Sequence, residues 1–208
     1  MSTTSGKSQR PRQSPIENPH ALKNLASSYR LARGKTASKQ TQSPQPTGKE
    51  IDMLIYGIDP GYTGAVSLYW TETGKLECYD MPTMKNPKGK TLINLHELLR
   101  ILSNEADESC LAVIERVSAM PGQGVSSTFR FGQGYGQLEM GIAACKLPIQ
   151  YVSPAVWKKH FGLNRDKGVS RGLVTQRLPQ YAHLFARVKD DGRAEATLIA
   201  LYAAEKLI

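Results

Sequence analysis

The clearest pattern in the chain is a series of short apolar runs separated by turn residues, which begins near Met53. Runs of this length, bounded by Gly, Pro, Asp or Thr, are typical of buried strands. They predict strands at residues 53–58, 65–70, 76–81, 111–114 and 149–152. Tight turns join the first three of these strands, which indicates an antiparallel meander.

Helical spacing of apolar residues marks other segments of the same region. The first such segment contains Leu92, Leu95, Leu98, Leu99 and Leu102. It follows residues 82–90, which we expect to form a flexible basic loop. Further helices are expected at residues 127–145, 157–161, 169–178 and 191–207. A meander extended by crossover strands with covering helices predicts an α/β fold, with a mixed five-stranded sheet flanked by helices.

The composition changes at about residue 50. The segment before it is rich in Ser, Gln, Pro and Lys, and its nine basic and two acidic residues supply +7 (9 − 2) of the chain's formal +9. Such a segment buries too little apolar surface to offset its ordering entropy. We therefore predict a disordered basic extension, residues 1–50, before a folded domain, residues 53–208. The extension is open to three interpretations: a solvated basic arm, an organellar transit peptide, or an artefact of the start site, with Met53 as an internal start.

Three cysteines lie far apart and match no metal-binding or redox spacing, which favours a reducing compartment. The sequence has no apolar run approaching the roughly 18 residues that span a bilayer, and no secretory signal at its N-terminus. We expect no membrane partner and a cytoplasmic location, with organellar import as the alternative.

Four carboxylates lie where strands or helices begin or end. Asp59 closes the first strand and Glu115 closes the fourth, and these strands are neighbours in the expected order. Asp191 and Glu195 are one turn apart at the start of the last helix and share a face. Each has an ordinary alternative, as a turn residue, a salt-bridge partner or a complement to the helix dipole. Together they predict a site for Mg²⁺ of the kind that cleaves phosphodiesters.

Basic side chains that could contact phosphate lie in three places. The candidates are Lys85, Lys88, Arg130, Lys158, Lys159 and Lys167. Neutralisation of phosphates by such groups drives nucleic-acid affinity and makes it salt-dependent. The alternative for any one of them is a solvated surface charge. Glycines at positions 132, 134, 136 and 141 weaken the expected helix and suggest close packing, against the sheet or across a dimer interface.

Several of these segments resemble one known family. Residues 57–61 (GIDPG), 113–117 (VIERV) and 191–200 (DGRAEATLIA) resemble the acidic motifs of RuvC-type Holliday junction resolvases. Residues 120–124 (MPGQG) and 153–158 (SPAVWK) are similar to the phage and prophage members of that group. The resemblance covers essentially the whole expected folded domain.

The resemblance implies an RNase H-like nuclease domain, a homodimer, Mg²⁺ or Mn²⁺, and paired symmetric nicks across a four-way DNA junction. It makes Asp59, Glu115, Asp191 and Glu195 the catalytic metal ligands. It also implies that Lys158 and Lys167 match basic residues near the DNA.

The chain departs from the family pattern at two places. The family usually ends in two aspartates three residues apart, whereas here the spacing is four and the last acid is Glu195, so Asp190 is an alternative to Asp191. Ser118 stands near the position where the family often has a stacking aromatic residue. Junction opening would then use Met120, Phe129 or Phe131, or another device.

Three other functions compete with junction resolution. An RNase H-like nuclease acting on RNA or on another branched nucleic acid would have the same acidic site. An actin-like or sugar-kinase ATPase shares the phosphate-loop pattern of residues 59–63 (DPGYT), but it needs two lobes, and this chain has room for one. A non-catalytic DNA-binding module is the third, and the four carboxylates argue against it.

Overall fold

The computed structural model describes residues 52–106, 109–118, 122–163 and 167–208. The predicted disordered extension, residues 1–50, and Met120 lie outside the described residues. The side chain of Lys167 also lies outside them.

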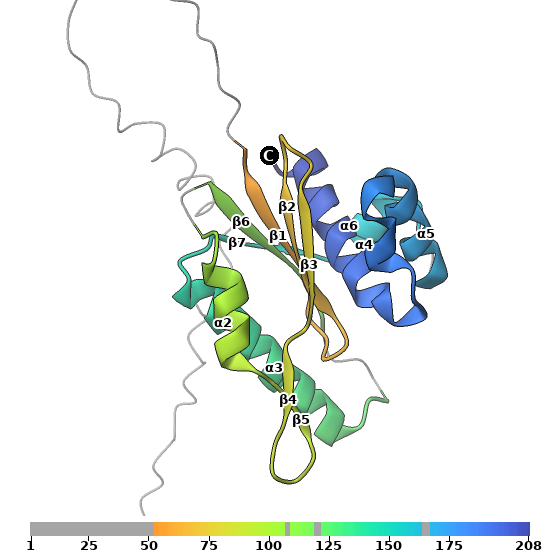
Figure 1. The fold of residues 1–208 in the computed structure, drawn as a ribbon. Helices are drawn as coiled ribbons and strands as arrows, with labels where there is room; N and C mark the ends of the chain where they lie inside the picture. The colour runs from red at the N-terminus through yellow and green to blue at the C-terminus, as the bar shows by residue number, and fades with distance from the viewer. Residues whose placement is uncertain (1–51, 107–108, 119–121, 164–166) are drawn as a thin grey trace, which may run out of the picture. The chain divides into compact units, whose positions relative to one another are not determined.

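A five-stranded mixed sheet forms the centre of the described domain (Figure 1). Its strands are β1 (Leu54–Asp59), β2 (Ala65–Trp70), β3 (Leu76–Asp80), β6 (Cys110–Glu115) and β7 (Ile149–Val152). They lie in the order β3-β2-β1-β6-β7, where β3, β2 and β1 pair antiparallel and β1, β6 and β7 pair parallel. The short apolar runs and tight turns thus form the predicted meander, and the predicted mixed five-stranded sheet flanked by helices is confirmed.

Helices cover both faces of the sheet (Figure 1). Helices α2 (Leu95–Ser103) and α3 (Val125–Ala144) lie on one face, and α4 (Pro154–His160), α5 (Lys167–Arg177) and α6 (Asp191–Lys206) lie on the other. Alternate residues of a strand point to opposite faces. Tyr56 and Ile58 therefore enter the α2–α3 core, while Ile55 enters the α4–α6 core. None of the helices in the described part is long and apolar enough to cross a bilayer.

The prediction of a basic loop followed by a helix from Leu92 is wrong. Residues 83–93 contain a separate two-stranded hairpin, β4 (Thr83–Lys85) and β5 (Thr91–Ile93), in which Leu92 pairs with Met84. The helix begins at Leu95 because Asn94 caps it, its side-chain oxygen accepting from the Glu97 amide at 3.3 Å. Leu92 has helical spacing to Leu95, but it lies on the other side of this cap.

Two short 3₁₀ segments, η2 (Pro179–Phe185) and η3 (Val188–Asp190), also precede α6. The sequence analysis did not predict them, because short 3₁₀ turns lack a 3.6-residue apolar period. Their place in the chain fixes where α6 begins, directly after Asp190.

Candidate active site

Asp59 and Glu115 lie at the same edge of the sheet. They are the last residues of β1 and β6, and the parallel register pairs Ile58 with Ile114 directly before them. The carboxyl ends of neighbouring parallel strands therefore present both acids together, as the sequence predicted. Asp59 is followed by a tight turn in which the Gly64 amide donates to the Gly61 carbonyl at 2.9 Å.

Glu115 is held from both helical layers. The indole Nε1 of Trp157 in α4 donates to its Oε1 at 2.9 Å, and the Tyr135 hydroxyl in α3 donates to its backbone carbonyl at 3.3 Å. The glutamate is only 8% exposed, and Trp157 is fully buried. Burial raises the pKa of Glu115 and the nearby Glu195 adds to the rise, although the Trp157 hydrogen bond opposes it.

Helix α6 brings Asp191 and Glu195 to this edge because it packs unusually close to β1. A Cβ on Gly57 would lie 2.1 Å from the Ala196 carbonyl oxygen, and one on Gly192 would lie 2.5 Å from the Thr63 carbonyl oxygen. Only glycine permits backbones to approach so closely. The glycines in the first and last acidic segments therefore place the first turns of α6 against the end of β1 and the turn that follows it.

Each α6 carboxylate is paired with a cation from a neighbouring helix. Arg171 of α5 donates to Asp191 at 2.7 Å, and Lys158 of α4 donates to Glu195 at 3.1 Å. All four side chains are between 13% and 27% exposed, so these pairs are partly shielded from solvent. They offset the repulsion that clustered carboxylates would otherwise experience.

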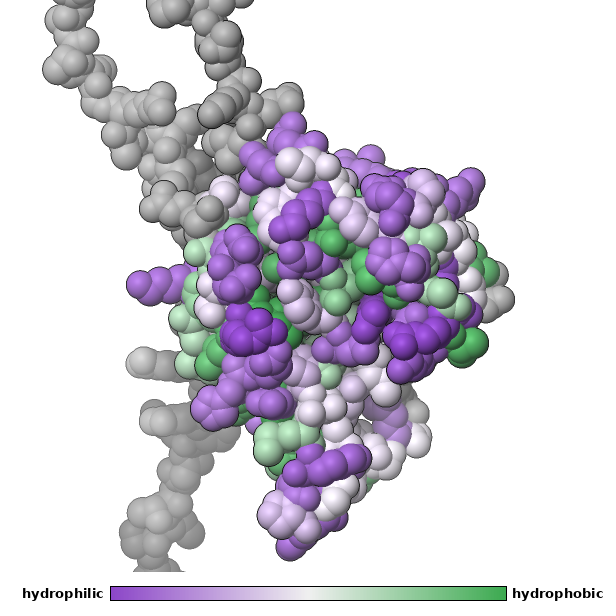
Figure 2. All heavy atoms as spheres, in the orientation of Figure 1, coloured by the Kyte–Doolittle hydropathy of each residue, from purple (hydrophilic) through white to green (hydrophobic). Residues whose placement is uncertain are grey.

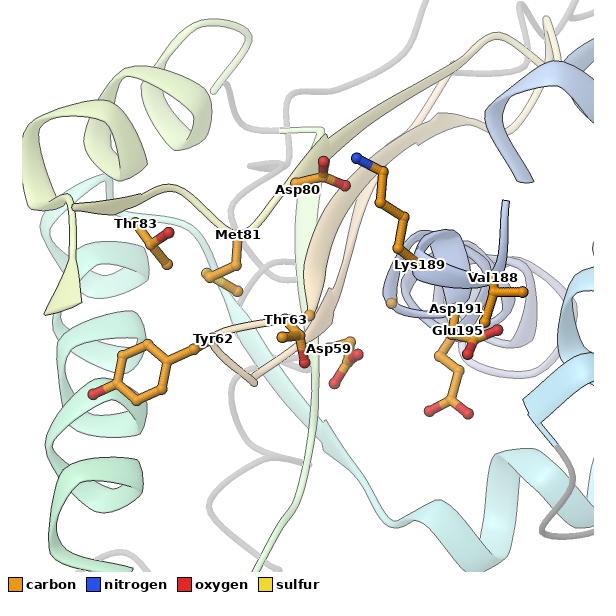
Figure 3. A pocket seen from close by; sticks show the side chains of 12 residues that line it. Asp59, Tyr62, Thr63, Asp80, Met81, Thr83, Val188, Lys189, Asp191 and Glu195 are labelled. Carbon is orange, nitrogen blue, oxygen red and sulfur yellow. The ribbon is translucent and has the colours of Figure 1, made fainter. Parts of the chain in front are cut away.

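The carboxylates open into a pocket of about 380 Å³. Asp59, Asp191 and Glu195 line it, together with Tyr62, Asp80 and Lys189 from its other walls (Figure 3). Glu115 does not line this pocket, although it interacts electrostatically with Glu195. The pocket therefore contains three of the four predicted acids, and the fourth lies at the adjoining strand end.

Asp190 has a different role from Asp191. Its side chain is buried and accepts hydrogen bonds from the Arg187 backbone amide at 2.8 Å and from the Arg187 guanidinium. These bonds to Arg187 hold the pKa of Asp190 below its usual range. Asp190 is absent from the pocket lining, so Asp191 is the acid that faces the site.

The described side chains include no group of three or more His, Cys, Asp or Glu spaced to hold a metal ion. In this arrangement Arg171 and Lys158 engage the acids of α6. The chemistry of the donors still suits a hard divalent ion, since such ions prefer several carboxylate oxygens. The residues that could hold one are Asp59, Glu115, Asp191 and Glu195.

The other predicted DNA contacts are spread over the domain. Lys85 and Lys88 are exposed on the β4–β5 hairpin, whose end is hydrophilic in Figure 2. Lys159 is exposed on α4, next to Lys158. Arg130 is partly buried and donates to the Thr91 carbonyl at 3.2 Å. These side chains therefore do not converge on the carboxylate pocket, with the exception of Lys158.

Sequence reasoning missed several residues of the site. Tyr62, Asp80 and Lys189 line the pocket, and Arg193 holds Asp80 through a bidentate ion pair. Tyr62 could have been found, because it lies three residues after Asp59 in the same turn. Asp80 and Lys189 gave no comparable signal, since each resembles an ordinary surface charge in the sequence.

Solved structures that match this chain include two of the same protein. The structure of Thermus thermophilus RuvC superimposes with a TM-score of 0.47 and 15% identity, and covers 74% of this chain and 96% of the RuvC chain. T. thermophilus RuvC in complex with Holliday junction substrate gives a TM-score of 0.42 and 16% identity, over 73% of this chain and 92% of that one. No family model and no curated protein sequence matches the chain.

Proposed function

We propose that this chain is a metal-dependent endonuclease that resolves four-way DNA junctions by paired, symmetric nicks. The observation that carries the proposal is the shared pocket of Asp59, Asp191 and Glu195, beside the buried Glu115. The four acids come from two strand ends and one helix and converge at one edge of the sheet. Repulsion between the clustered carboxylates lowers the stability of the fold unless cations compensate it. Lys158 and Arg171 provide part of this compensation.

Asp59, Glu115, Asp191 and Glu195 would hold Mg²⁺ or Mn²⁺ through their carboxylate oxygens. When bound, divalent ions supply Lewis-acid stabilisation of phosphodiester cleavage. Without such ions, Lys158 neutralises Glu195 and Arg171 neutralises Asp191. With divalent ions at the carboxylates, these two cations would be available to contact the phosphates of a bound strand.

A four-way junction is the proposed substrate because the acidic segments and residues 153–158 resemble those of junction resolvases. Productive resolution needs two opposed strands of like polarity to be cut. One pocket per chain cuts one strand, so two chains related by a two-fold axis are required.

Helix α3 offers a surface for such a dimer. Its outward side exposes Val125 (87%), Phe129 (73%) and Met140 (67%). On the same helix, a Cβ at Gly132 or Gly136 would meet nothing within 4 Å. Gly134 and Gly141 are instead buried against Tyr62, Ile93, Leu98 and Leu102. Gly134 and Gly141 thus pack toward the domain, while Gly132 and Gly136 would leave room for a second copy.

The proposal is tested with a synthetic four-way junction labelled in turn on each strand. In Mg²⁺ the two opposed strands of like polarity should be nicked, at symmetric positions, and excess EDTA should abolish cleavage. Sedimentation of the protein–junction complex should show two protein chains. Cuts on adjacent strands, or a monomer on the junction, would refute junction resolution. Preferential cleavage of an RNA–DNA hybrid or a forked duplex would assign the same site to another nucleic acid.

A further inference from the structure

A second cavity, of about 360 Å³, adjoins the carboxylate pocket. Its walls combine two rings, one guanidinium and three small polar side chains. The residues are Tyr62, Phe131, Arg130, Gln123, Ser127 and Thr128. Its volume falls within the range of about 300–1,000 Å³ that is usual for small-molecule sites.

Tyr62 connects the two cavities, because it lines both of them. Its ring projects away from Asp191 and Glu195 toward α3 (Figure 3). Its hydroxyl donates to the Arg130 carbonyl at 2.9 Å, which fixes the ring at the border between the cavities. A ligand in the second cavity would therefore lie beside any group bound at the carboxylates.

Arg130 presents unused hydrogen-bonding capacity in this region. One terminal nitrogen donates to the Thr91 carbonyl, and the guanidinium carbon lies 5.6 Å from the centre of the Tyr62 ring. Its Nε is buried and has no hydrogen-bond partner among the described residues. Because Arg130 lines the cavity, a ligand there could contact the guanidinium plane and its terminal N–H groups.

The combination of groups selects one class of ligand. Flat rings favour a planar aromatic molecule, whereas Gln123, Ser127, Thr128 and Arg130 require hydrogen-bonding edges on it. Nucleobases have both properties, and proteins bind them by stacking on aromatic or guanidinium planes with polar contacts to their edges. A lone phosphate would leave the rings unused, and an apolar ligand would leave the polar groups unused.

We propose that the second cavity binds one nucleobase of the DNA strand, next to the phosphodiester at the carboxylates. The identity of that base then influences where the enzyme cuts. This inference rests on the proposed nuclease function, because it assigns the cavity to the same bound strand.

The first test measures base stacking without cleavage. 2-Aminopurine is placed at each position flanking the crossover of a four-way junction, and its fluorescence is followed on protein addition in EDTA. One position should be quenched on binding. On binding, Phe131→Leu should weaken the apparent affinity measured from this quenching by about tenfold. The matched Phe161→Leu changes a partly buried ring on the other face of the sheet, outside the cavity, and should leave that affinity unchanged. Quenching at no position, or equal effects of the two variants, would overturn the proposal.

The second test measures the effect on cutting. A junction library randomised around the crossover is cleaved in Mg²⁺, and rates are compared between the best and worst bases at the quenched position. The double variant Gln123→Ala, Ser127→Ala should compress this ratio, whereas Gln176→Ala, at an exposed position on α5 outside the cavity, should preserve it. An unchanged ratio in the double variant would contradict base reading. Absence of cleavage together with position-specific quenching would instead refute the nuclease function and leave the base site in place.

Discussion

The change Trp157→Phe removes a single hydrogen-bond donor from the buried side of Glu115. In the structure this donor lies 2.9 Å from Oε1, and it comes from a fully buried indole that packs with the α4–α6 core. Phenylalanine keeps an aromatic ring in that core but has no N–H group. The change therefore affects mainly the orientation and the solvation of the carboxylate.

The expected magnitude follows from the burial of Glu115. A hydrogen bond to a charged group contributes about 1.5–3 kcal/mol, and the carboxylate is too buried to replace it fully with water. Loss of a partner that orients a metal ligand typically weakens metal affinity by about 10–100-fold. We therefore expect Trp157→Phe to reduce Mn²⁺ affinity by at least about tenfold.

The assay is calorimetric titration of the metal-free protein with Mn²⁺, without DNA. Trp70→Phe is the matched control, because Trp70 is the other tryptophan of the chain and lies on β2, partly covered by Lys75. It should leave Mn²⁺ affinity unchanged. If Trp157→Phe binds Mn²⁺ as tightly as the wild type while remaining folded, the indole does not position Glu115.

Three further predictions concern other parts of the chain. Gly192→Ala places a Cβ 2.5 Å from the Thr63 carbonyl oxygen, so calorimetry should show a loss of stability of about 1–3 kcal/mol; an unchanged Tm would contradict the close packing of α6. Asp190→Asn should lower stability at neutral pH and retain metal-dependent cleavage. Arg187 depresses the folded-state pKa of Asp190, so the ionised carboxylate stabilises the fold above the unfolded pKa, and this stabilisation is lost as pH falls through the folded pKa. The denaturation curves of the variant and the wild type should therefore converge in acid. A stability difference that does not change with pH would contradict this. Deleting residues 1–50 should weaken junction binding and reduce its salt dependence, measured by fluorescence anisotropy, while cleavage persists; equal salt slopes would show that the extension makes no phosphate contacts.

The sheet and two of its acids were predictable because their signals are local. Each apolar run stops abruptly at its acid, Asp59 or Glu115, and the order of strands makes β1 and β6 neighbours. The i and i+4 spacing of Asp191 and Glu195 similarly fixes them to one face of α6. These features depend only on strand ends and helix periodicity.

The rest depends on contacts between distant segments. Trp157 and Glu115 are 42 residues apart, and no periodicity links them. The choice of Asp191 over Asp190 follows from the 3₁₀ turn in which Arg187 engages Asp190, which short-range patterns do not reveal. The β4–β5 hairpin was missed because Leu92 continues the helical spacing by coincidence, across the Asn94 cap.

The most direct test of the central claim compares two aspartate variants of one segment. Asp59→Asn removes the carboxylate at the pocket end of β1, whereas Asp52→Asn changes an acid just before the opposite end, where it accepts from the Glu72 amide. Cleavage of a four-way junction in Mg²⁺ is measured for both, together with junction binding in EDTA. The account predicts that Asp59→Asn binds the junction but loses cleavage, while Asp52→Asn cleaves like the wild type. Wild-type cleavage by Asp59→Asn would contradict it.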